Sequence, residues 1–139
     1  MKPYAIASLA ALLFSSSSTV EATQCRLPPC GRFENNTPWA AKWGDLGLTD
    51  HRCKLWNVAD PVRCKQFDLA ARDSRGGYFN SPRVDVDAIC YANRRYYVKW
   101  GNDESELGVG AGVWVKIRSD QTARCRERNG APHCTINPR

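Results

Sequence analysis

Two sets of side chains in this sequence have the types and spacing needed for acid–base chemistry. His51 and His133 are the only two histidines, and a pair of imidazoles could serve as general acid and base in the cleavage of RNA. Asp85 and Asp87 alternate along an expected strand, so their carboxylates would share one face about 7 Å apart. That separation suits the acid and the base of an inverting glycosidase. A secreted hydrolase, either a ribonuclease or a glycosidase, is therefore one function to consider.

A structural role explains the same residues. Two unrelated histidines on loops would look identical in the sequence, and the two carboxylates could form exposed ion pairs with Arg95 and Lys99 across a hairpin. The motifs Gly-x-Ser-x-Gly and His-Glu-x-x-His are both absent, and no cofactor motif is present. The sequence therefore favours binding over catalysis.

The charge of the chain indicates what could be bound. Twenty Lys and Arg residues against fourteen Asp and Glu residues give a net charge of +6. Arginines crowd the C-terminal segment, at positions 118, 124, 126, 128 and 139. Arg95, Tyr97 and Lys99 share the outer face of an expected hairpin, which places an aromatic ring between two cations. Such a surface can bind an anionic polymer, a glycan or a lipid head group, with the ring stacking on bases or sugars. The predicted ligand-binding residues are Arg95, Tyr97, Lys99, Arg124, Arg126 and Arg128. Mixed surface charge that serves only solubility is the alternative.

Two further features concern sugars. Trp39, Trp43 and Trp56 could form a stacking platform, as in a carbohydrate-binding module, although tryptophan in a small domain more often fills the core. Asn35-Asn36-Thr37 is an N-glycosylation sequon, and its use would place Asn35 at the surface.

Seven cysteines must hold these residues in place. Because the number is odd, at most three disulfides form and one thiol remains, either free or in a disulfide-linked dimer. Their spacing includes no Cys-x-x-Cys and no zinc pattern, so we expect no structural metal site. Asn129-Gly130 predicts a two-residue type I′ hairpin that sets Cys125 opposite Cys134, with Cα atoms about 4.5 Å apart, which is within disulfide range. Cys53 and Cys64 could close a second hairpin.

The elements that carry these residues are expected to be strands. Apolar residues occur in short, often alternating runs bounded by Gly, Pro, Asn and Asp. The runs are Phe33–Trp43, Cys53–Val58, Arg83–Tyr91, Arg95–Trp100, Gly112–Arg118 and Ala123–Arg128. Only Lys65–Arg75 approaches a helical period. The sequence predicts a mostly-β fold, a small disulfide-stabilised antiparallel β-sandwich or barrel with at most one short helix.

A further hairpin, separate from the two that the cysteines would close, is expected around the loop Ala92-Asn93-Arg94. Its register pairs Cys90 with Tyr96 and Ala88 with Val98, which places apolar residues opposite apolar residues. The same register sets Asp87 opposite Lys99 on the outer face.

Met1–Ala22 has the pattern of a secretory signal peptide. Lys2 provides the positive charge, Ala5–Phe14 an apolar stretch too short to span a bilayer, and Val20-Glu21-Ala22 a cleavage site. Residues 23–139 then form a single secreted domain in an oxidising compartment, with no transmembrane segment, as a monomer or a disulfide-linked dimer.

Several short motifs together suggest a family. They are Asn35-Asn36-Thr37-Pro38-Trp39, Cys53-Lys54-Leu55-Trp56-Asn57, Arg75-Gly76-Gly77, Val84-Asp85-Val86-Asp87-Ala88 and Gly112-Val113-Trp114-Val115-Lys116-Ile117, with Cys125 near the end. The layout resembles small cysteine-containing secreted proteins of filamentous fungi, many regarded as effector or toxin candidates. The resemblance implies an extracellular virulence protein that binds a component of a host or a competing microbe. It carries over no catalytic residues.

Overall fold

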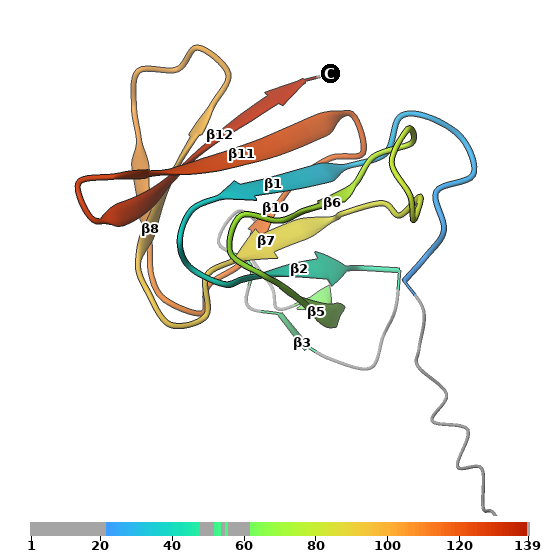
Figure 1. Ribbon diagram of the computed structural model, residues 1–139, viewed down its shortest axis with the longest axis horizontal. Helices are drawn as coiled ribbons and strands as arrows, with labels where there is room; N and C mark the ends of the chain where they lie inside the picture. Colours follow the sequence, from blue (N-terminus) through green and yellow to red (C-terminus); the bar gives the residue numbers. More distant parts are fainter. Residues whose placement is uncertain (1–21, 48–51, 54, 56–61, 139) are drawn as a thin grey trace, which may run out of the picture.

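The computed structural model describes residues 22–47, 52–53, 55 and 62–138, which form twelve β-strands and no helix (Figure 1). A six-stranded sheet has the order β6 (Ser74–Gly76), β1 (Arg32–Asn36), β11 (Gln121–Arg128), β12 (Ala131–Pro138), β8 (Tyr96–Trp100) and β9 (Leu107–Val109). A four-stranded sheet has the order β10 (Val115–Lys116), β7 (Ala88–Cys90), β2 (Ala41–Asp45) and β5 (Lys65–Leu69). A two-stranded ladder joins β3 (Arg52–Cys53) to β4 (Val62–Arg63).

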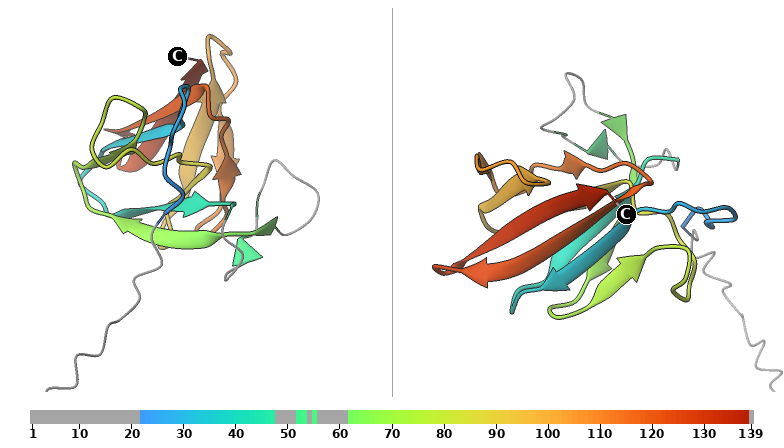
Figure 2. Two further views of the ribbon diagram at one scale, coloured as in Figure 1. Left: turned by 90° about the vertical axis from the view of Figure 1, so that its right-hand side faces the viewer. Right: turned by 90° about the horizontal axis from the view of Figure 1, so that it is seen from above.

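The predicted mostly-β, disulfide-stabilised fold is confirmed. The sheets are not wholly antiparallel, because β1 pairs with β11 and β12 pairs with β8 in parallel. The two sheets form separate layers, which are visible in the turned views of Figure 2. Phe33, Val98 and Ile136 from the larger sheet pack with Trp43 and Ile89 from the smaller one in a single buried cluster. Burial of these side chains is the main force that holds the layers together.

The alternation of buried and exposed residues fixes which side of the larger sheet faces water. On β11, Ala123 and Cys125 are buried, whereas Arg124 and Arg126 are exposed. Successive side chains of a strand point to opposite faces, so the arginines lie on the outer side of the sheet.

The hairpin of β11 and β12 has the predicted register. Cys125 lies opposite Cys134, and Asn129 and Gly130 form the turn with positive φ values of 51° and 76°. These are the backbone angles that a type I′ turn requires. The predicted disulfides Cys125–Cys134 and Cys53–Cys64 are both present.

The remaining cysteines complete the pattern. Cys25 is joined to Cys30, a pair that the sequence left unassigned, and Cys90 is the free thiol. Cys90 lies on a central strand of the smaller sheet and is almost fully buried. Burial, opposed by Lys42 and by the backbone amide of Gly112, raises the pKa of its thiol to about 12, so it remains protonated and unreactive. The oligomeric state stays a prediction.

The one short helix that the sequence allowed, over Lys65–Arg75, does not form. This segment contains β5 and β6, joined by a turn in which Arg72 has a φ of 63°. Strand β5 pairs with β2, and Phe67 lies directly opposite Trp43. The two rings stack with centroids 4.4 Å apart. This cross-strand contact and the ladder hydrogen bonds outweigh a weak helical pattern.

The hairpin predicted across Ala92-Asn93-Arg94 is also wrong. Strand β7 pairs with β2 and β10 in the smaller sheet, whereas β8 pairs with β12 and β9 in the larger one. The chain therefore crosses from one layer to the other between Cys90 and Tyr96. Both strands are apolar and half or fully buried, and the sequence pattern does not distinguish pairing within one sheet from crossing between two.

Other expected strands are shorter or divided. The run Phe33–Trp43 contains two strands in different sheets, β1 and β2. The runs that begin at Arg83 and Gly112 contain only β7 and β10, together with bridges at Val84 and Trp114. Three predicted features lie wholly or partly outside the described residues. They are the leader up to residue 21, His51, and part of the run Cys53–Val58. No helix in the described part is long and apolar enough to cross a membrane.

Candidate functional site

The outer side of the larger sheet gathers the predicted ligand-binding residues. We call it the basic face and define it by its cationic and aromatic side chains: Arg32, Arg95, Tyr97, Lys99, Arg124, Arg126, Arg128 and His133. Strand pairing assembles the face in rows. Arg126 lies opposite His133, and His133 lies opposite Tyr97, so these three residues cross β11, β12 and β8 in line. The next row contains Arg124, Thr135 and Lys99.

A pair of stacked rings lies in the first of these rows. The rings of Tyr97 and His133 are nearly parallel, with an interplanar angle of 11° and centroids 4.7 Å apart. The guanidinium of Arg95 lies 5.6 Å from the centroid of Tyr97, in cation–π range. Gly108 of β9 provides the room for this group, because a Cβ at that position would collide with the Arg95 guanidinium.

Glu106 holds one side of the ring pair. Its carboxylate accepts hydrogen bonds from Nη2 of Arg128 at 2.8 Å and lies 3.0 Å from Nδ1 of His133. Burial raises the pKa of this carboxyl, but the hydrogen bonds and charges of His133 and Arg128 outweigh it and keep the pKa below its usual range. Glu106 therefore stays ionised and orients both partners.

Glu34 has a similar role on β1. It accepts hydrogen bonds from Nε of Arg32 at 3.0 Å and from Nε of Arg124 at 2.8 Å. Burial of its carboxyl is outweighed by these two guanidinium groups, so the pKa of Glu34 is lowered. Three arginines of the basic face, Arg32, Arg124 and Arg128, are thus neutralised in part by the protein itself.

The remaining cations are not compensated in this way. Neither Lys99 nor Arg126 has an acidic partner among the described residues, and Arg95 lies against a ring. These three cations surround the stacked rings of Tyr97 and His133. An anionic group placed beside the rings would find positive charge from all three cations.

The two predicted carboxylates each accept hydrogen bonds from neighbouring chain segments. Asp85 accepts hydrogen bonds from the amide of Gly31 at 2.6 Å and from the hydroxyl of Ser119 at 2.8 Å. Asp87 accepts a hydrogen bond from the amide of Leu46 at 2.9 Å. The expected ion pairs with Arg95 and Lys99 are therefore wrong. Lys99 belongs to β8 of the larger sheet, whereas both aspartates lie just before β7 of the smaller sheet. They tie neighbouring chain segments together.

Asp87 nevertheless has an unusual environment. Burial raises the pKa of its carboxyl to about 7; the amide of Leu46 and the charge of Lys116 oppose this shift, while Asp85 and Asp45 add to it. A carboxyl that titrates near neutrality could transfer protons. Asp87 is not among the residues that line the cavity beside Trp43 and Phe67.

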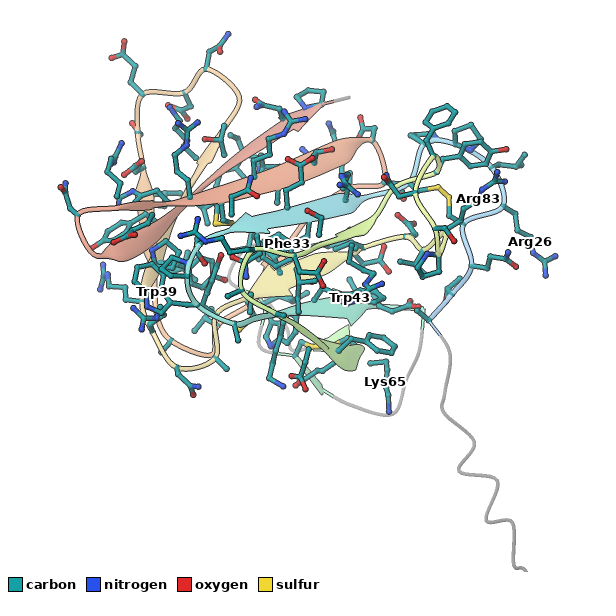
Figure 3. All side chains as sticks on the ribbon, in the orientation of Figure 1. Arg26, Phe33, Trp39, Trp43, Lys65 and Arg83 are labelled. Carbon is teal, nitrogen blue, oxygen red and sulfur yellow. A yellow bond between two sulfur atoms is a disulfide. The ribbon has the colours of Figure 1, made fainter. Side chains whose placement is uncertain are left out.

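A cavity of about 820 Å³ opens beside the stacked Trp43 and Phe67, and Arg75 and Asp68 also line it. Trp43 is almost fully buried. Trp39 lies well apart from Trp43 (Figure 3) and has the guanidinium of Arg94 3.9 Å from its ring centroid. Trp56 lies outside the described residues. A shared stacking platform of Trp39 and Trp43 is therefore not formed.

The expectation that Asn35 lies at the surface is also wrong. Asn35 is fully buried, its side-chain amide donates to the carbonyl oxygens of Trp39 and Ala70, and its Oδ1 accepts from the hydroxyls of Thr37 and Tyr91. A glycan on this nitrogen would break both donated bonds and has no room. Asn35 and Thr37 of the sequon therefore form part of a buried hydrogen-bond network.

The predicted pair of histidines stays a prediction. His133 lies on β12 and not on a loop, and His51 is outside the described residues. Sequence reasoning found six residues of the basic face. It missed Arg32 and His133, whose places there depend on the pairing of β1 with β11 and of β12 with β8. It also missed Glu106 beside them, which the loop before β9 positions.

Comparison with protein-family models found no matching family, and comparisons with curated proteins and with solved structures found no significant match. The function is therefore argued from the geometry of the basic face.

Proposed function

We propose that this chain is a secreted, effector- or toxin-like binding protein whose basic face engages an anionic polymer at the surface of a host or a competing microbe. The observation that carries the proposal is the position of Lys99, Arg126 and Arg95 around the stacked rings of Tyr97 and His133. Surface cations without an acidic partner are free to pair with a ligand, and their charges add along a polymer.

The rest of the chain supports a binding role outside the cell. Three disulfides are compatible with an oxidising compartment, as the predicted signal peptide requires. The resemblance to small secreted fungal proteins points in the same direction. The alternatives, a hydrolase or a carbohydrate-binding module, lack support because Asp85 and Asp87 bind backbone and Ser119 groups, and Trp43 is buried.

The test compares two double variants that each remove two positive charges. Lys99→Gln/Arg126→Gln changes the basic face, whereas Arg26→Gln/Arg83→Gln changes cations on two loops outside it. The probes are a labelled heparin oligosaccharide, which presents sulfates, and a labelled DNA duplex, which presents phosphates. Binding is measured by fluorescence anisotropy at low salt.

We expect the first variant to lose about tenfold in affinity for the probe that binds better, because each ionic contact with a polyanion releases counterions and so strengthens binding. The second variant should lose less than threefold. Equal losses from both variants would show that net charge alone is responsible, and would refute the proposal. Absence of binding of either probe by the unaltered protein would refute it as well.

A further inference from the structure

Two apolar side chains are exposed far beyond the rest of the described structure. Leu27 is 80% exposed and Phe79 is 87% exposed, whereas the next large apolar residue, Leu107, is 39% exposed. Keeping a phenyl ring and an isobutyl group in water is unfavourable, and such exposure at neighbouring positions often marks a contact surface.

The two residues belong to loops that are fastened together at their bases. One loop, 25–30, is closed by the disulfide Cys25–Cys30. The other, 77–83, contains Phe79. The amide of Cys25 donates to the carbonyl of Arg83 at 2.8 Å, and the amide of Gly77 donates to the carbonyl of Gly31 at 3.1 Å. Both loops therefore project from the same end of the molecule; we call them the loop tip.

The loop tip is positively charged. Arg26 precedes Leu27, and the guanidinium of Arg83 lies 4.6 Å from the ring centroid of Tyr78, which in turn contacts Phe79 edge-on at 5.2 Å. Figure 3 shows Arg26 and Arg83 at this same end. Neither Cys25–Phe33 nor Ser74–Val84 contains an acidic residue. The two loops thus carry cations and no acidic residue.

We propose that the loop tip inserts into an anionic lipid bilayer. Leu27 and Phe79 would enter the acyl region, Tyr78 would lie at the level of the head groups, and Arg26 and Arg83 would pair with lipid phosphates. The disulfide and the two prolines that follow Leu27 restrict the first loop before binding, so little further order is required.

This surface differs from the basic face. The Asn129-Gly130 turn beside Arg128 and the loop tip lie at opposite ends of the ribbon (Figure 1). The two proposals can therefore fail separately, and each pair of charge variants serves as the control for the other.

The test is co-sedimentation with vesicles of phosphatidylcholine alone or with one quarter phosphatidylserine. The unaltered protein is expected to bind the anionic vesicles and not the neutral ones. Leu27→Ser/Phe79→Ser should lose at least tenfold in binding, whereas Leu107→Ser, a matched change at another exposed apolar site, should lose less than twofold. Because Leu27 and Phe79 are exposed, the far-ultraviolet spectrum of the double variant should be unchanged.

The charge variants separate the two surfaces. Arg26→Gln/Arg83→Gln should lose about tenfold in binding at low salt, since each cation near an anionic membrane contributes separately, and Lys99→Gln/Arg126→Gln less than threefold. In a Phe79→Trp variant, the added fluorescence should shift to the blue on binding and be quenched by brominated acyl chains, which reports insertion.

Three results would overturn the proposal. They are unchanged binding of Leu27→Ser/Phe79→Ser, loss of binding only in Lys99→Gln/Arg126→Gln, and no binding of the unaltered protein to anionic vesicles.

Discussion

The imidazole of His133 lies nearly parallel to the phenol ring of Tyr97, and the ring centroids are 4.7 Å apart. The two residues are distant in the sequence and meet because β12 pairs with β8 in parallel. Glu106 fixes the imidazole from one side, and Arg95 lies against the phenol ring on the same sheet. This contact is the centre of the basic face, and the proposed function depends on it.

Removing the phenol ring should weaken ligand binding. We expect Tyr97→Ala to reduce affinity for the preferred anionic probe roughly fivefold, because a stacked aromatic contact is worth about 1 kcal/mol. Anisotropy titration measures the change. Tyr78→Ala, which removes a ring beside Arg83 on the loop tip, is the matched control and should leave this affinity unaltered; a similar loss in both variants would contradict the role of Tyr97.

The stability of the protein should depend on Asp87 in a defined direction. Burial raises the pKa of this carboxyl from 3.8 to about 7, so the folded protein retains a proton that the unfolded chain has already lost. The free energy of unfolding should therefore fall as the pH rises from about 4 to 7, by on the order of 1–2 kcal/mol for this half-buried group.

Asp87→Asn provides the control, because its side-chain oxygen can still accept the hydrogen bond from Leu46. Urea unfolding at several pH values should show that the difference in stability between variant and unaltered protein grows towards pH 7. Glu34 and Glu106 lose their favourable charge at low pH in both proteins, so their effect cancels in the difference. A difference that is constant with pH would contradict the assignment.

Asn35 should be essential for stability and free of glycan. Its amide makes four hydrogen bonds inside the core, so Asn35→Ala should cost roughly 2–4 kcal/mol of unfolding free energy. The neighbouring Asn36 is exposed, and Asn36→Ala should cost less than about 0.5 kcal/mol. The absence of a glycan is tested by the intact mass of protein expressed through a eukaryotic secretory pathway. A glycan at Asn35 would contradict the buried position.

The backbone nitrogen of Thr23 lies 2.5 Å from Oδ2 of the buried Asp45. Cleavage of the predicted leader after Ala22 would convert this amide into an ammonium group, and the hydrogen bond would become an ion pair. A chain that begins at Thr23 should therefore be about 1–2 kcal/mol more stable than one that retains Ala22. Asp45→Asn should abolish this advantage in thermal unfolding, and an equal advantage in that variant would contradict the pairing.

Local signals allowed some of this structure to be predicted. Asn129-Gly130 determines a turn whose geometry fixes the register of β11 and β12, and with it the disulfide Cys125–Cys134. The clustering of arginines in the C-terminal segment also singled out Arg124 and Arg126, which are exposed in the structure.

The predictions that failed concern contacts between distant segments. Alternation at Ala88 and Val98 fits a shared hairpin, but these residues lie in different sheets. His133 belongs to the basic face only through the parallel pairing of β12 with β8, which no turn residue signals. Asn35 reads as a surface sequon until Tyr91 and Trp39 are brought beside it.

The most direct test of the basic face is the salt dependence of its affinity for the preferred anionic probe. The slope of the logarithm of the binding constant against the logarithm of salt concentration should become shallower by about two in Lys99→Gln/Arg126→Gln, since each lost ionic contact removes about one unit. It should stay unchanged in Arg26→Gln/Arg83→Gln. An unaltered slope in the first variant would show that the anion binds elsewhere.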